Sequence, residues 1–188
     1  MQQLTALSIS ILLLIGCTSV VNTLTTEPIQ PDPTKKGVVS NINDVKMSTF
    51  IGVNLKKADP ALDDAHINVT AVNSVVLLAG EVPTKELKKL AGEVARAYTG
   101  ARKVHNELQV RGNTSLVSRT NDSILAAQIR TKLVFEEQVN SSQITVVAED
   151  GVIFLMGVTT KENGDLAATI ASSNSGVRKV VKVFEYVD

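Results

Sequence analysis

An internal repeat constrains the fold of this 188-residue chain more than any other sequence feature. Residues 67–80 read INVTAVNSVVLLAG and return 77 positions later, at 144–157, as ITVVAEDGVIFLMG. The run GARKV at 100–104 returns 76 positions later as GVRKV at 176–180. Offsets that drift by one residue are what loop insertions and deletions produce, and a fixed period indicates repeated structural units. The chain therefore contains two homologous units that meet near residues 112–120.

Each unit is expected to begin with a helix and a β-hairpin. Apolar residues at every fourth position predict an amphipathic helix in each unit, namely Met47, Ile51 and Leu55 in the first and Leu125, Ile129 and Leu133 in the second. Two β-rich runs follow, and they flank a tight turn at Asn73-Ser74 or at Asp150-Gly151. Asp-Gly between apolar runs is a strong hairpin signal because glycine adopts a positive φ without steric cost.

A second helix and a last strand complete each unit. The apolar positions of this helix are Leu87, Leu90, Ala91, Val94 and Tyr98 in the first unit and Leu166, Ala167 and Ile170 in the second. Thr84 is its predicted N-cap and Gly100 its predicted stop. The last strand is expected near residues 103–110 and 179–187. The order α-β-β-α-β predicts an α+β fold, in which two helices cover one face of a three-stranded mixed sheet in each unit.

This order and two glycine motifs resemble the BON domain family. The motifs are the Val-x-Leu-x-Gly strand end, at 76–80 and 153–157, and the Gly-x-x-x-Val strand start that is quoted above. We expect two tandem BON domains at residues 44–112 and 121–188, joined by a linker at 113–120. The motifs are structural and identify the fold far better than the function. The resemblance implies phospholipid binding and maintenance of envelope integrity, without catalysis.

The N-terminus predicts export and lipidation. Residues 4–16 are almost wholly apolar and end in LIGC at 14–17, a short apolar run with small residues at its end, as cleaved signal peptides have. A bilayer span needs about 20 apolar residues, so we expect residues 1–16 to be removed. LIGC resembles the bacterial lipobox, which implies that Cys17 is lipidated; the alternative is a free thiol after an ordinary signal peptide. Two BON domains behind a lipobox resemble the dual BON-domain outer-membrane lipoproteins.

Residues 17–43 are expected to form the lipidated N-terminus and a flexible tether. Pro28, Pro31 and Pro33 lie there among polar residues without a sustained hydrophobic period, which is typical of linkers. Thr18, and not an aspartate, follows the cysteine. By resemblance to Gram-negative sorting rules, this implies the outer membrane, with the protein anchored by lipid and facing the periplasm.

Composition and motifs argue against nucleic-acid binding and catalysis. The chain has 19 basic and 19 acidic residues, whereas nucleic-acid-binding domains are usually strongly basic. No serine-hydrolase, zinc-protease or phosphate-loop motif is present. His66 and His105 have no acidic or cysteine ligand at metal-binding spacing, and an enzyme or metal protein would rest on these two histidines alone. We therefore predict no catalytic residue, no metal site and no cofactor.

The first helices of the two units differ on one edge. At the offset of 78 residues, Lys46 corresponds to Ile124 and Lys57 to Phe135. At 100° per residue, Ile124 and Phe135 lie within about 20° of each other around the helix axis. The second unit therefore has an additional apolar edge where the first is charged.

This edge is the candidate for binding anionic phospholipid. Ile124 and Phe135 are expected to insert into the membrane, and Leu133 and Val134 to support them. Two basic residues of the same helix, Arg130 and Lys132, are expected to contact head groups. In one alternative, Ile124 and Phe135 pack against the first domain or the connecting loops. In another, this edge or an exposed strand docks an envelope assembly or division protein.

Overall fold

The computed structural model describes residues 40–187. Cys17, the predicted signal peptide and most of the expected tether lie outside the described residues. The first domain contains α3 (Ser40–Ala58), α4 (Pro60–Asp64), β1 (Ile67–Val72), β2 (Val75–Val82), α5 (Lys85–Ala97), β3 (Lys103–Asn106) and β4 (Gln109–Val110). Helix α3 begins inside the segment that was expected to be tether, and the short helix α4 was not predicted.

The second domain contains α6 (Leu116–Phe135), the 3-10 helix η2 (Ser141–Gln143), β5 (Thr145–Glu149), β6 (Val152–Thr159), α7 (Lys161–Ser172) and β7 (Lys179–Tyr186). Helix α6 begins at Leu116, within the segment that was predicted to be a linker. The reason is local, because the Ser115 side chain accepts a hydrogen bond from the Ser118 N–H at 3.2 Å and so caps the helix there.

Each domain has the predicted mixed sheet. β2 pairs antiparallel with β1 and parallel with β3 and β4, and β6 pairs antiparallel with β5 and parallel with β7. The hairpin turns also lie where the sequence placed them, with positive φ at Asn73, Ser74, Asp150 and Gly151. The last strand differs between the domains: β7 is continuous, whereas β3 and β4 are separated by Glu107 and the fully buried Leu108.

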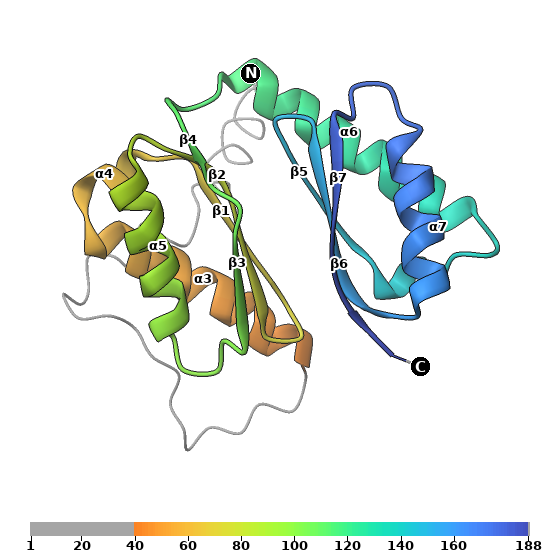
Figure 1. The fold of residues 1–188 in the computed structure, drawn as a ribbon, viewed down its shortest axis with the longest axis horizontal. Helices are drawn as coiled ribbons and strands as arrows, with labels where there is room; N and C mark the ends of the chain where they lie inside the picture. Colours follow the sequence, from red (N-terminus) through yellow and green to blue (C-terminus); the bar gives the residue numbers. More distant parts are fainter. Residues whose placement is uncertain (1–39, 188) are drawn as a thin grey trace, which may run out of the picture.

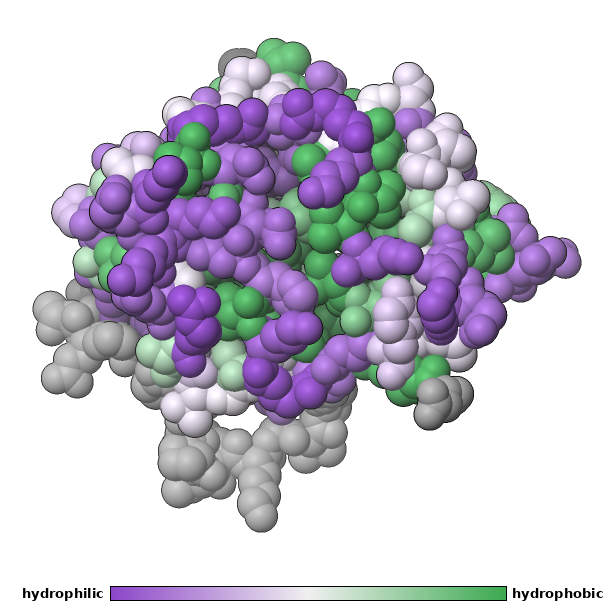
Figure 2. Space-filling view, viewed as in Figure 1, coloured by the Kyte–Doolittle hydropathy of each residue, from purple (hydrophilic) through white to green (hydrophobic). Residues whose placement is uncertain are grey.

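The two sheets pack against each other through the faces that the helices leave open. Along β2, Val76 and Leu78 face the helices of the first domain, while Val75, Leu77 and Ala79 join Val147, Phe154, Met156 and Val183 of the second domain in one cluster. Figure 1 shows the sheets in the middle of the molecule, with α3 to α5 on one outer side and α6 and α7 on the other. In Figure 2, hydrophobic residues gather in the hollow between the two halves.

One buried aspartate in each first helix fixes the hairpin turn. Asp44 accepts hydrogen bonds from the N–H groups of Asn73 (2.7 Å) and Ser74 (2.9 Å). In the second domain, Asp122 accepts them from Asp150 (2.7 Å) and Gly151 (2.9 Å). Because each carboxylate accepts hydrogen bonds from two backbone N–H groups of the turn, it holds the first helix to the hairpin in both repeats.

Candidate functional site

The outer side of α6 exposes a stripe of large apolar side chains. Phe135 is 81% exposed and Ile124 is 52% exposed, and Val117 and Val134 are also exposed. Val117, Ile124 and Phe135 lie within about 20° of one another around the helix axis. The structure therefore leaves Ile124 and Phe135 on the surface and does not bury them against the first domain.

The inner side of α6 holds the helix in the core of its domain. Leu125, Ile129 and Leu133 are buried in one cluster with Val146, Ile153 and Leu155 of the sheet. Leu133 is 1% exposed. It can therefore support the helix from beneath Val134 and Phe135, but it cannot touch a surface that docks from outside.

The charged side chains of α6 lie on different sides of the helix. Lys132 is exposed about 80° from Ile124, next to the apolar stripe. Arg130 lies about 120° away in the other direction, and its guanidinium donates a hydrogen bond to the Val146 carbonyl at 2.5 Å. Asp122 is the one acidic residue of α6, and it is buried. Between Leu116 and Phe135 the exposed side of α6 therefore carries no carboxylate, and Glu136 and Glu137 follow directly after the helix.

Arg130 lines a groove between the domains. The groove has a volume of about 370 Å³ and is bordered by residues of β1, α6 and β5, including His66, Asn68, Arg119 and Glu149. Helical periodicity separates Arg130 from Lys132 around α6, but only the tertiary structure shows that Arg130 borders the groove. The pattern gives the angle around α6, but it does not indicate which side the first domain covers.

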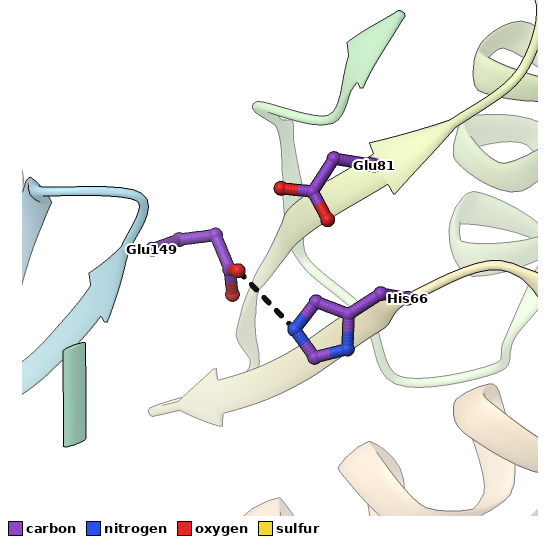
Figure 3. A group of neighbouring side chains, drawn as sticks. All are labelled: His66, Glu81 and Glu149. Atoms are coloured by element: carbon purple, nitrogen blue, oxygen red, sulfur yellow. Dashed lines mark ion pairs between the residues drawn. The ribbon is translucent and has the colours of Figure 1, made fainter. Parts of the chain in front are cut away.

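A group of ionisable side chains meets where the two domains touch. His66 precedes β1, Glu81 lies in β2, and Glu149 ends β5; Figure 3 shows the three side chains pointing toward one another. Their candidate ligand atoms all lie within 4.8 Å of one another. Sequence spacing could not reveal this group, because Glu149 comes from the other domain. His105 lies apart from this group, on β3, where it pairs with Leu77 of β2. Its partial burial and the nearby Lys103 lower its pKa.

No helix among residues 40–187 is both long enough and apolar enough to cross a bilayer.

The BON domain model matches the chain twice, at residues 51–112 and 121–188. The chain belongs to the BON domain family. BON domain 1 and BON domain 2 therefore name the two halves described above. The matched regions contain both mixed sheets and the helices that cover them, except the start of α3 and of α6.

Two relatives align with most of the chain. The outer membrane lipoprotein DolP of Haemophilus influenzae is 32% identical over 160 residues, which cover 85% of this chain and 82% of the relative. The 21 kDa hemolysin of Actinobacillus pleuropneumoniae is 31% identical over 162 residues, which cover 86% of this chain and 81% of the relative. A solved structure, the C-terminal domain of CdsD of Chlamydia trachomatis, aligns with 77% of this chain and with 67% of the CdsD chain. The two are 16% identical in sequence, and the TM-score is 0.30.

The glycine that ends the central strand motif has a steric role in both BON domains. Gly80 has φ +123°, and a Cβ there would lie 2.1 Å from the His66 carbonyl oxygen. Gly157 has φ +152°, and its Cβ would lie 1.9 Å from the Gln143 carbonyl oxygen. The backbone just before the first strand of each domain thus crosses directly over the glycine. In BON domain 1 this crossing brings His66 beside Glu81. The backbone N–H of Glu81 donates a hydrogen bond to the His66 carbonyl oxygen at 2.8 Å.

Proposed function

We propose that this chain is a non-enzymatic outer-membrane lipoprotein, anchored through Cys17, that binds anionic phospholipid through BON domain 2 and supports envelope integrity. The observation that carries the lipid-binding part is the exposure of Ile124 and Phe135 on one side of α6, a side without any carboxylate. The anchor and the location are supported by the lipobox-like run at 14–17 and by the similarity to a relative that is named an outer membrane lipoprotein.

In this proposal the residues of α6 have different roles. Ile124 and Phe135 enter the boundary between head groups and acyl chains, Val134 extends their surface, and Leu133 holds the helix from the core. Lys132 lies where it can contact a phosphate beside the apolar stripe. Arg130 lies nearer the interdomain groove, so it would reach only lipid head groups that extend toward that side.

The expected energies explain why an anchor would accompany such a site. Complete burial of an Ile or Phe side chain contributes about 1.5 to 3 kcal/mol, and a basic residue near an anionic surface contributes about 1 kcal/mol. These contacts alone give weak binding. A lipid anchor on the same chain raises the effective concentration of the site at the membrane, so α6 can orient the body or select among lipids.

Vesicle flotation of the body that begins at Thr18 tests the proposal without the anchor. This body retains all of residues 40–187, which form both domains. With anionic vesicles, the Ile124→Lys, Phe135→Lys double variant should lose binding although it gains two positive charges. The matched control is Val45→Lys, Val110→Lys, which places the same charges on exposed apolar positions of BON domain 1. Unchanged binding of the α6 variant would refute the assignment.

The alternative is a protein-interaction module that docks an envelope assembly partner. The observation in its favour is that Leu116 and Val117 extend the exposed apolar stripe to the far end of α6, about 30 Å from Phe135. A photo-crosslinking residue at Ile124 separates the two functions in cells. Adducts with lipid support the proposal, whereas a single dominant protein adduct supports the alternative.

A further inference from the structure

We propose that His66, Glu81 and Glu149 bind one divalent transition-metal ion, with Zn²⁺ as the best fit, and that this ion joins the two BON domains. The site is independent of the lipid-binding proposal, because it uses none of the exposed residues of α6. Two of its ligands come from BON domain 1 and one from BON domain 2 (Figure 3).

The distances between the ligand atoms fit tetrahedral coordination of a small ion. The His66 Nε2 atom lies 3.2 Å from the Glu149 Oε1 atom. Ligand atoms that bind Zn²⁺ at about 2.0 to 2.2 Å lie about 3.3 to 3.6 Å apart in a tetrahedron, so these two atoms are already close to the required separation. All three ligand atoms lie within 4.8 Å, and a small movement of a carboxylate closes the remaining distance. An imidazole among the ligands favours zinc over magnesium.

The charges around the site favour a cation. Glu81 is fully buried and Glu149 is more than nine-tenths buried, and two buried carboxylates so close to each other are unfavourable unless they are compensated. Arg111 compensates Glu81 at 3.0 Å. Among residues 40–187, His66 is the one basic side chain within ion-pair distance of Glu149. A bound cation would therefore neutralise a carboxylate that no arginine or lysine reaches.

Neighbouring groups already hold the side chain of Glu81 and the backbone of His66. The Glu81 carboxylate accepts hydrogen bonds from Arg111, from the Thr114 N–H at 3.2 Å and from the Thr114 hydroxyl at 3.1 Å. The backbone N–H of His66 donates a hydrogen bond to the Asn113 side-chain oxygen at 3.1 Å. Each carboxylate oxygen has more than one lone pair, so these bonds leave acceptor capacity toward His66. Such supporting contacts are typical of metal sites, where they fix the ligands in place.

The groove described above provides access. His66 and Glu149 border its volume of about 370 Å³, which is open to solvent and large enough for a water molecule to complete the coordination of the ion. BON domain 2 has no second copy of the site, because Gln143 and Val158 occupy the positions that correspond to His66 and Glu81. The expected stoichiometry is therefore one ion per chain.

Calorimetric titration with ZnCl₂ tests the site on the full chain, purified in detergent without a histidine tag and treated with a chelator. We expect one Zn²⁺ per chain and no comparable binding of Mg²⁺. His66→Gln and Glu149→Gln should each weaken binding by at least about tenfold, a loss that even indirect partners of metal ligands produce. His105→Gln is the matched control, because it removes the other histidine of the chain and should leave the affinity unchanged.

Thermal unfolding provides a second measurement, which reports the stability of the chain and not the heat of binding. Saturating Zn²⁺ should raise the Tm of the wild-type chain, because a ligand that binds only the folded state stabilises it, and the rise should disappear in Glu149→Gln. The proposal is overturned if wild-type protein shows no saturable binding. It is also overturned if His66→Gln and Glu149→Gln bind as tightly as wild type, or if His105→Gln loses as much affinity as they do.

Discussion

The first helices of the two BON domains, α3 and α6, have the same inner side and different outer sides. Asp44 and Asp122 bind the hairpin turns in the same way, and Met47 and Leu125 both begin the apolar core stripe. On the outside, Lys46 of α3 takes the place that Ile124 has in α6. The residues that build the fold are thus shared by the repeats, whereas the outward residues are free to differ, and the difference locates the candidate function in BON domain 2.

The largest effect should come from the shared glycines. Gly80→Ala and Gly157→Ala should each destabilise the chain by about 4 kcal/mol or more, because the new methyl group meets a backbone oxygen and the φ value is unfavourable for alanine. Urea unfolding measures this change. Gly112→Ala is the control, because a Cβ there meets nothing within 4 Å. If only one of the two substitutions lowers stability, the backbone does not cross over the glycine in the same way in both repeats.

The shared aspartates should come next. Asp44→Ala and Asp122→Ala should each lower the free energy of unfolding by about 2 to 4 kcal/mol, since each removes two charge-assisted hydrogen bonds between the first helix and the turn. The same urea unfolding measures both. Asp64→Ala, at an exposed position, should change stability by less than about 0.5 kcal/mol. Unequal losses for Asp44 and Asp122 would show that the two turns are held differently.

A transplant of the outer side tests the difference between the helices. Lys46→Ile with Lys57→Phe gives α3 the apolar residues that α6 has at these two positions. Added to the Ile124→Lys, Phe135→Lys variant, this pair should raise vesicle affinity about tenfold, which corresponds to about 1.4 kcal/mol. The gain in apolar burial exceeds the loss of two positive charges. Flotation measures the recovery. If no binding returns, the context of BON domain 2 matters beyond these two positions.

The smallest effect concerns the contact between the domains. Arg102 of BON domain 1 pairs with Glu185 of BON domain 2 at 2.5 Å, and Asn73 donates to the same carboxylate at 2.9 Å. The Arg102 side chain lowers the pKa of Glu185 below its ordinary value of 4.5. A lowered pKa in the folded state gives stability that is present above the unfolded pKa and lost as the pH falls through the folded one.

Arg102→Ala should therefore raise the pKa of Glu185 toward 4.5 and flatten the loss of stability below that pH. The change should be less than about 1 kcal/mol, because the pair is partly exposed. NMR titration of the Glu185 carboxyl measures the shift, with Arg96→Ala as a control on the other side of BON domain 1. An unchanged Glu185 titration would mean that this pair does not form in solution.

Much of each domain could be predicted because the signals were local. Thr84 caps α5 through a hydrogen bond from the Leu87 N–H, as its position before the helix suggested. The start of α6 at Leu116 was missed, although Ser115 gave a capping signal that lay before the apolar period of the helix. The exposed edge formed by Ile124 and Phe135 followed from helical spacing, whereas the position of Arg130 beside the groove did not.

By itself, the sequence determined the repeat, the order of elements, the hairpin turns and the apolar edge of α6, since each of these depends on residues close together along the chain. Only the tertiary structure decided that the two sheets pack face to face and that His66 meets Glu81 and Glu149. Residues 75–80 of β2 are apolar and buried on both faces, a pattern that is typical of a strand covered by two layers. The pattern could not indicate which surface supplies the second layer, because packing between domains depends on the shape and charge of whole faces.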